Sequence, residues 1–166
     1  MSEIIRKQLT LFLPEKYSVE IEKVRQKYNP IQANLIKSHV TLCREDEIEN
    51  ICEIIENLKS LDEKVLEIKF DRILRFSDEK GVLIFSSKKN SEYQNLRKLI
   101  LKDLNSEIRL PEPHITLMHP RNSTCTNKIF EEITKIDFPK SIKFEKISFI
   151  EQKNGGKWKI LEEFKL

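Results

Sequence analysis

Two five-residue segments of this chain share one pattern, in which a histidine is followed by a β-branched residue, a threonine and a leucine. The first is residues 38–42 (SHVTL) and the second is residues 113–117 (PHITL). Valine, isoleucine and threonine are all branched at Cβ, so each segment favours a β-strand. About half of the 166-residue chain separates the two copies. We therefore expect a fold that brings two short, similar strands face to face.

The alternation of side chains along a strand gives each segment two different faces. His39 and Thr41 share one face of the first strand, and His114 and Thr116 share one face of the second. The aliphatic residues between them point to the other side, where a core can form. An imidazole gives or takes a proton near neutral pH, and a hydroxyl can donate a hydrogen bond to an oxyanion. Two such pairs supply the base, the acid and the donors that displacement at a phosphodiester requires.

A metal site is one alternative for these histidines. A single strand histidine more often has a structural or surface role, and only the matched repetition argues for chemistry. Neither histidine has a second ligand four residues further on, and no His-Glu-x-x-His pattern occurs. The sequence therefore predicts no metal and no cofactor.

Composition sets the class of protein. Hydrophobic residues make up 39% and charged residues 34% of the chain, which is typical of a globular protein with a charged surface. The net charge of +3 permits a phosphate substrate without demanding one. Cys43, Cys52 and Cys125 form no Cys-x-x-Cys pair, so free thiols in a reducing compartment are expected. No apolar run approaches a membrane span and the N-terminus lacks a signal-peptide core, so we expect a cytoplasmic protein that does not bind membranes.

The rest of the chain alternates predicted strands and helices, which indicates an α+β fold. Phe12, Tyr28, Phe85 and Trp158 could stack on a base, but each is expected to serve the core or packing. Strands are predicted over residues 6–13, 38–43, 65–76, 82–85, 113–118, 141–150 and 157–164. Helices are predicted over residues 18–28, 47–58, 93–104 and 127–136, and residues 31–37 form a connection of uncertain structure.

The paired motifs resemble the signature of the 2H phosphoesterase superfamily, the group of 2′-5′ RNA ligase-like proteins and cyclic phosphodiesterases. The opening strand before Pro14, the segment 28–30 ahead of the first motif and the hairpin at Gly81 are similar as well, so the resemblance covers most of the chain. It implies a bilobal, pseudo-twofold α+β fold, in which two antiparallel sheets line a central groove and helices lie outside. It also implies a single domain over residues 1–166.

The resemblance implies a metal-independent mechanism as well. One histidine activates the attacking water or hydroxyl, the other protonates the leaving oxygen, and the two threonines hold the phosphate oxygens. His39, Thr41, His114 and Thr116 match these roles position for position. The near-symmetry of the motifs leaves open which histidine is the base.

Two positions near the motifs depart from the expected pattern or extend it. The family often has proline before the first histidine, where this chain has Ser38. Arg121, shortly after the second motif, is a candidate phosphate-binding residue because guanidinium groups bind phosphate well, although a solvated loop arginine is an equal alternative. His119 would fall on the face opposite His114 if the strand ran straight, which favours a structural or exposed role.

The leading hypothesis is a phosphodiesterase acting on 2′,3′-cyclic phosphate ends of RNA or nucleotides, working as a monomer. One alternative is a 2′-5′ oligonucleotide phosphodiesterase or ligase. A second is a binding module of the same fold that holds RNA or a nucleotide without turning it over.

Overall fold

The structure is a computed structural model that describes residues 2–86, 90–104 and 107–166. It contains nine strands and five α-helices. The strands are β1 (Ile5–Phe12), β2 (His39–Cys43), β3 (Leu66–Lys69), β4 (Arg72–Phe76), β5 (Gly81–Phe85), β6 (His114–Met118), β7 (Ser141–Phe144), β8 (Lys146–Lys153) and β9 (Trp158–Lys165). The helices are α1 (Glu15–Tyr28), α2 (Pro30–Leu35), α3 (Ile51–Lys59), α4 (Ser91–Ile100) and α5 (Asn127–Thr134).

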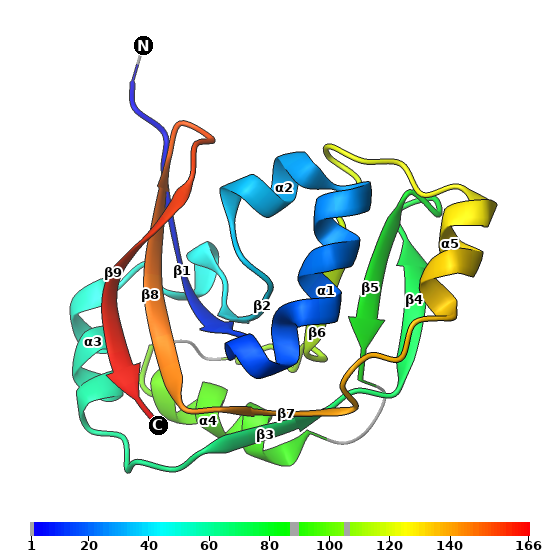
Figure 1. Cartoon of the computed structure of the whole chain (residues 1–166). Coiled ribbons are helices and arrows are strands. Elements are labelled where there is room, and N and C mark those ends of the chain that lie inside the picture. The colour runs from blue at the N-terminus through cyan, green and yellow to red at the C-terminus, as the bar shows by residue number, and fades with distance from the viewer. Residues whose placement is uncertain (1, 87–89, 105–106) are drawn as a thin grey trace.

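The strands form two antiparallel sheets, which confirms the predicted α+β class. One sheet has seven strands in the order β4-β5-β6-β2-β1-β8-β9, and the other consists of β3 and β7. In Figure 1, β1, β8 and β9 lie at the left and β4 and β5 at the right, with α5 beside β4 and β5. The two predicted hairpins, β4–β5 and β8–β9, are both present.

The two motif strands lie side by side rather than face to face. β2 and β6 are the central neighbours of the seven-stranded sheet. Their ladder holds one residue pair, Val40 with Ile115, whereas β1 pairs with β8 over six positions. The large sheet therefore consists of two halves, β4-β5-β6 and β2-β1-β8-β9, that meet at the motifs.

Two predicted strands are each divided into two strands that belong to different sheets. The run over residues 65–76 becomes β3 and β4, and the run over 141–150 becomes β7 and β8. β3 and β7 pair with each other, from Leu66 with Phe144 to Lys69 with Ser141. An apolar run does not reveal where a chain leaves one sheet for another, because buried residues are needed in both sheets.

The helical segments differ from prediction by at most four residues at either end. Helix α1 begins at Glu15, directly after Pro14, and most of the uncertain connection over residues 31–37 belongs to α2, which begins at Pro30. Proline suits the first turn of a helix, where its missing N–H has no intrahelical partner.

The core lies on the face of the motif strands that carries the aliphatic residues. Val40, Leu42, Ile115 and Leu117 are all buried. Helix α1 contacts β6, and α3 contacts α4. The apolar side of each motif is thus fixed by packing, which leaves the histidine and threonine side open to another use.

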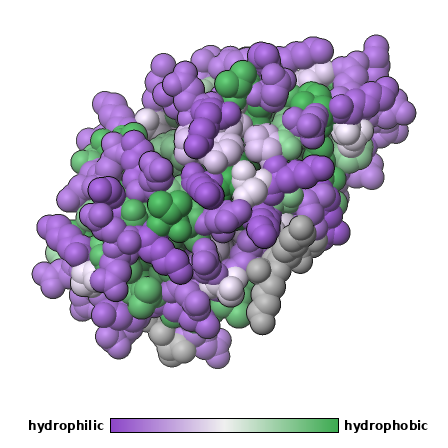
Figure 2. Space-filling view, turned by 60° about the horizontal axis from the view of Figure 1, so that its bottom comes forward, coloured by the Kyte–Doolittle hydropathy of each residue, from purple (hydrophilic) through white to green (hydrophobic). Residues whose placement is uncertain are grey.

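The surface is mixed in character. On the face shown in Figure 2, hydrophilic side chains cover most of the area and apolar residues form small separate patches. Over the described parts of the chain, no helix is both long and apolar enough to cross a membrane.

Candidate active site

The four motif residues lie on one face of two adjacent strands. β2 and β6 have the same burial pattern, with half-buried histidine and threonine alternating with buried aliphatic residues. The pairing of Val40 with Ile115 sets their register. Continuing this antiparallel register by one position in each direction places His39 opposite Thr116 and Thr41 opposite His114.

Both histidine rings are anchored in the same way. Nδ1 of His39 lies 2.8 Å from the carbonyl oxygen of Lys37, and Nδ1 of His114 lies 3.3 Å from the carbonyl oxygen of Glu112. A carbonyl oxygen can only accept, so Nδ1 carries a proton in both rings. In the neutral ring, Nε2 is then left as the atom that can accept a proton.

The environment of His39 disfavours its protonation. The pKa of His39 is lowered to about 4, mainly by burial, with the nearby Arg25 and His114 contributing in the same direction. The hydrogen bond to the Lys37 carbonyl and the Glu22 carboxylate oppose this shift without cancelling it. His39 is therefore neutral near pH 7 and has a free lone pair on Nε2.

His114 is shifted in the same direction. Burial lowers its pKa below the ordinary value, and the hydrogen bond with the Glu112 carbonyl acts in the opposite sense. The pairing of Val40 with Ile115 places the two rings on the same face of neighbouring strands, and His114 is among the groups that lower the pKa of His39. A negatively charged group bound between them would raise the pKa of both rings.

The two motif threonines have uncommitted hydroxyls. Within the described ranges, the Oγ1 atoms of Thr41 and Thr116 make no hydrogen bond, although both side chains are half-buried. The backbone carbonyl of Thr41, by contrast, accepts a hydrogen bond of 2.8 Å from the Tyr93 hydroxyl on α4. The strand is thus fixed from behind, while its hydroxyl remains available on the open face.

Helix α1 holds the segment that enters β2. The Glu22 carboxylate accepts a hydrogen bond of 2.6 Å from the backbone N–H of Ser38. The buried Arg25 guanidinium donates to the carbonyl of Ile36 at 2.7 Å and to Glu22 at 2.9 Å. Serine before His39 is accounted for by this contact, because proline has no N–H to donate.

Arg97 on α4 supports the other end of β2. Its guanidinium donates to the Leu42 carbonyl and forms an ion pair of 2.5 Å with Glu47, and the Arg97 side chain is only 1% exposed. The Glu47 carboxylate also pairs with Arg109 at 3.2 Å. This buried pair connects α4 to the strand immediately after Thr41.

Phenylalanines flank both histidines. Phe12 on β1 is paired with His39, with ring centroids 6.1 Å apart in an edge-on arrangement. Phe85 on β5 is paired with His114, and the Arg72 guanidinium lies 5.0 Å from the Phe85 ring centroid. Phe12 and Phe85 are half-buried, and the strand register puts them on the face of the histidines rather than in the core. The sequence alone does not mark them as site residues, because their exposure depends on which strands become neighbours.

The third histidine lies on the face that carries the site. β6 has a bulge, since Leu83 pairs with Thr116 but the preceding Val82 pairs with Met118. Leu117 and Met118 are therefore both buried, and the next residue, His119, returns to the Thr116 face. The strand is not straight, so the expected position of His119 on the opposite face is wrong.

Arg121 lies beyond the end of β6, in a turn. Its side chain is exposed, and its backbone N–H donates to Nδ1 of His119 at 3.1 Å. Its guanidinium lies close enough to His119 to lower the pKa of that ring. Arg121 is thus associated with His119 rather than with the four motif residues.

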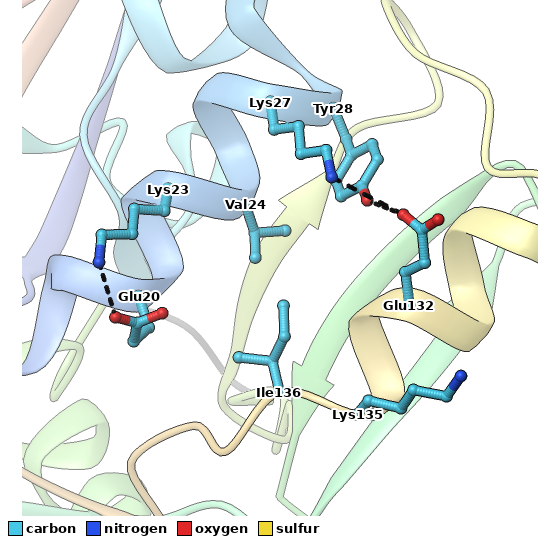
Figure 3. A pocket seen from close by; sticks show the side chains of 8 residues that line it. All are labelled: Glu20, Lys23, Val24, Lys27, Tyr28, Glu132, Lys135 and Ile136. Atoms are coloured by element: carbon cyan, nitrogen blue, oxygen red, sulfur yellow. Dashed lines mark hydrogen bonds and ion pairs between the residues drawn. The ribbon is translucent and has the colours of Figure 1, made fainter.

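Two cavities of the molecule are separate from the motifs. One, of about 330 Å³, lies between α1 and the end of α5 and is shown in Figure 3. Val24 and Ile136 form its apolar part, while Lys23 pairs with Glu20 at 3.0 Å and Lys27 pairs with Glu132 at 3.8 Å. The other, of about 340 Å³, lies between α3 and α4. No motif residue lines either cavity, and neither is lined by histidine.

No cluster of three histidine, cysteine, aspartate or glutamate side chains that could hold a metal ion exists in the part of the chain that the structure describes. The residues gathered on the motif face are instead imidazoles, hydroxyls and aromatic rings. Such a set can move protons, donate hydrogen bonds to an anion and pack against a ring.

Solved structures with the same fold include Escherichia coli LigT. LigT complexed with phosphate superposes with a TM-score of 0.65, at 17% identity and with 99% of each chain covered. LigT complexed with 3′-AMP gives a TM-score of 0.65 at 16% identity, covering 97% of each chain. A structure described as a phosphoesterase gives 0.64 at 15% identity, covering 98% of this chain and 99% of the other. At these identities the likeness establishes the fold.

The sequence itself establishes the family. The profile of the 2′-5′ RNA ligase superfamily matches residues 13–156, which is most of the chain and includes both motifs. The chain therefore belongs to the 2′-5′ RNA ligase superfamily, and the resemblance to 2H phosphoesterases is confirmed. No curated protein sequence gave a significant match.

Proposed function

We propose that this protein is a metal-independent phosphodiesterase that opens 2′,3′-cyclic phosphate ends of RNA or nucleotides. The observation that carries the proposal is the arrangement of His39 and His114. Each ring is anchored through Nδ1 to a backbone carbonyl, and each shares its strand face with a threonine that has an uncommitted hydroxyl. General acid-base catalysis needs two positioned proton-transfer groups on the two sides of the reacting phosphorus.

The reaction balances with these groups alone. The scissile phosphate lies between the rings, and Thr41 and Thr116 donate hydrogen bonds to its non-bridging oxygens. Nε2 of one histidine takes a proton from water as the water oxygen bonds to phosphorus. Nε2–H of the other histidine gives its proton to the sugar oxygen as the P–O bond breaks. The product is a phosphomonoester with a free neighbouring hydroxyl.

We assign the base role to His39 and the acid role to His114. The pKa of His39 is lowered to about 4, with Arg25 and His114 adding to the effect of burial. A base must be neutral when substrate arrives, and His39 meets that condition over the widest pH range. For His114, burial is the only cause that lowers the pKa, so the negative charge of a bound phosphate restores its proton more readily.

The ligands of similar proteins support a nucleotide substrate. Crystal structures of E. coli LigT hold phosphate, 3′-AMP, ATP and NADP+. In this chain Phe85 beside His114 and Phe12 beside His39 are placed where a base or ribose can pack. All four motif residues come from one chain, so we also propose that residues 1–166 act as one domain and as a monomer.

A 2′-5′ linkage is the second candidate substrate. Its cleavage or formation uses the same in-line exchange of oxygens at phosphorus and needs the same base and acid. A third possibility is a module that binds such ligands without turnover. The two uncommitted threonine hydroxyls and the two free Nε2 atoms favour catalysis over binding of the ligand without turnover.

A substrate panel assayed in EDTA tests the proposal. It holds a nucleoside 2′,3′-cyclic phosphate, an RNA ending in a 2′,3′-cyclic phosphate and a 2′-5′ oligoadenylate. We expect hydrolysis of the cyclic phosphates, unchanged by EDTA, with either the 2′- or the 3′-monoester as the single product. Turnover of the oligoadenylate alone would favour the second candidate. Binding of 3′-AMP without turnover of any substrate would favour the binding module.

A further inference from the structure

His119 is brought to the motif face by a bulge that is present twice in the sheet. In β6 the extra residue is Leu117, and in β2 it is Leu42, because Leu9 pairs with Cys43 while Thr10 pairs with Thr41. Because of the bulge, the two residues after each motif threonine both point into the core. The next residue along the chain then falls on the face of the histidine and threonine. The two motifs therefore continue into a further matched position, occupied by Arg44 and His119.

The surroundings fix His119 through every polar atom except one. Its backbone N–H donates to the buried Asn29 at 2.8 Å, and its carbonyl accepts from the backbone of Asn122 at 3.2 Å and from the Ser123 hydroxyl at 2.9 Å. Nδ1 accepts the backbone N–H of Arg121 at 3.1 Å. A ring that accepts at Nδ1 is a neutral tautomer with its proton on Nε2. Among the described residues none bonds to Nε2, so an oriented donor remains unused.

Two cationic residues act on the His119 ring. Burial lowers its pKa most, and Arg121 and Arg6 lower it as well. Arg6 is held in place, since its Nε lies 3.3 Å from Glu45 and its guanidinium lies 5.4 Å from the Trp158 ring centroid. Arg6 comes from β1 in one half of the sheet, whereas His119 and Arg121 follow β6 in the other half.

The donor lies too far along the strand to share the scissile phosphate. His119 follows Thr116 by three residues, or about 10 Å at the usual rise of a strand. At the matched position on β2, the Arg44 guanidinium is paired with Asp46 at 3.0 Å. The unused ring donor therefore exists on the β6 side only, which gives the site a direction.

We propose that His119, Arg6 and Arg121 form a second anion subsite, which binds a phosphate group of the substrate other than the one being cleaved. The inference rests on the proposed function for the identity of the substrate. Nε2–H of His119 supplies an oriented hydrogen bond, and the two guanidinium groups supply charge. The phosphate can be a terminal 5′-monoester or the next diester of an RNA chain, since both present the same non-bridging oxygens.

Two substitutions separate the subsite role of His119 from its role in the turn. In His119→Asn the amide oxygen can replace Nδ1 as acceptor for the Arg121 N–H, but the Nε2 donor is lost. In His119→Gln the longer amide can replace the Nε2 donor. Calorimetry measures the affinity of each variant and of the wild type for adenosine 3′-monophosphate, adenosine 3′,5′-bisphosphate and a dinucleotide with a 3′-phosphate.

The wild type should bind at least one of the two-phosphate ligands more tightly than the monophosphate. His119→Asn should weaken the binding of that two-phosphate ligand by about 10-fold or more, the scale of a hydrogen bond to a charged group. Its affinity for the monophosphate should not change. His119→Gln should keep most of the affinity for the two-phosphate ligand. Arg121→Gln should act like His119→Asn. The bisphosphate and the dinucleotide distinguish a terminal from an internal phosphate.

Equal affinity of the wild type for all three ligands would overturn the subsite, and so would equal losses for all three ligands in His119→Asn. These binding results do not depend on turnover. Hydrolysis of a mononucleoside 2′,3′-cyclic phosphate, which has one phosphate only, reports on the proposed function alone.

Discussion

Val40 is paired with Ile115 across the centre of the large sheet, and this pair joins the two halves that carry the motifs. Both side chains are completely buried. The neighbouring positions on each strand point the other way and carry His39, Thr41, His114 and Thr116. The spacing of the two histidines is therefore set by the packing directly beneath them.

Substituting Ile115 by smaller residues tests how strongly the packing beneath the motifs stabilises the fold. Ile115→Ala should lower the free energy of unfolding by about 2–5 kcal/mol, and Ile115→Val by about 0.5–1.5 kcal/mol, because a cavity forms in a packed core. Urea denaturation measures both values. Ile160, which is 52% exposed, provides the control, since Ile160→Ala should change stability by less than about 0.5 kcal/mol. Equal effects at the two positions would contradict the assigned packing.

The pH dependence follows from the directions of the two histidine shifts. The reaction needs neutral His39 and protonated His114. The pKa of His39 is about 4 and that of His114 is lowered from 6.5. Activity should therefore rise with pH as His39 loses its proton and fall as His114 loses its own. In the free enzyme the optimum should lie on the acid side of pH 6.5.

The profile of kcat/KM reports these free-enzyme values, and that of kcat reports the complex with substrate. Because bound phosphate raises both pKa values, the kcat profile should be displaced to higher pH. A kcat/KM optimum above pH 7, or identical profiles for the two parameters, would contradict the assigned roles.

Elements that are defined by their own residues could be predicted from the sequence, whereas features that are defined by pairing with a neighbouring strand could not. The two His-x-Thr strands could be recognised from their β-branched residues and their repetition. The bulges after Thr41 and Thr116 could not, because a bulge is defined by the pairing with β1 and β5. Without the second bulge, His119 was expected on the wrong face.

The flanking residues of the site were missed for a similar reason. Phe12 and Phe85 look like core residues in an apolar run, and only the strand order places them beside the histidines. The Glu22 contact with the Ser38 N–H depends on how α1 lies against β2. Neither the position of these phenylalanines nor the contact between Glu22 and Ser38 can be recognised from the residues nearby in the sequence.

Removing the motif hydroxyls should impair catalysis without unfolding the protein. Thr41→Val and Thr116→Val are close in shape to threonine and remove one donor each. A hydrogen bond to a charged group contributes about 1.5–3 kcal/mol, so kcat/KM should fall by about 10- to 100-fold. Thr41→Ser and Thr116→Ser keep the hydroxyl and should keep most of the activity. Denaturation curves close to wild type for all four variants would exclude a structural cause, and full activity in both valine variants would contradict the assigned role.

Breaking the buried ion pair behind β2 should affect both stability and activity. Arg97→Met leaves the Leu42 carbonyl without the Arg97 donor, and leaves Glu47 with Arg109 as its charged partner and the Arg44 N–H as its backbone donor. Loss of one partner of a buried pair costs about 3–5 kcal/mol, and kcat should fall because Thr41 precedes the freed carbonyl. The matched control is Lys23→Met, which breaks an exposed pair with Glu20 and should cost about 0–1 kcal/mol. Similar losses in the two variants would show that the buried pair does not support the strand.

The most direct test of the account is the activity of His39→Gln and His114→Gln on a nucleoside 2′,3′-cyclic phosphate, measured in EDTA beside the wild type and Lys23→Met. Each motif variant should lose about 10²–10⁴ in kcat while keeping a wild-type denaturation curve. The double variant should be little worse than either single variant, because the two groups act in one step. Lys23→Met, which changes an exposed residue away from the motifs, should keep full activity on this substrate. Full activity in either motif variant would contradict the acid-base pair and with it the proposed function.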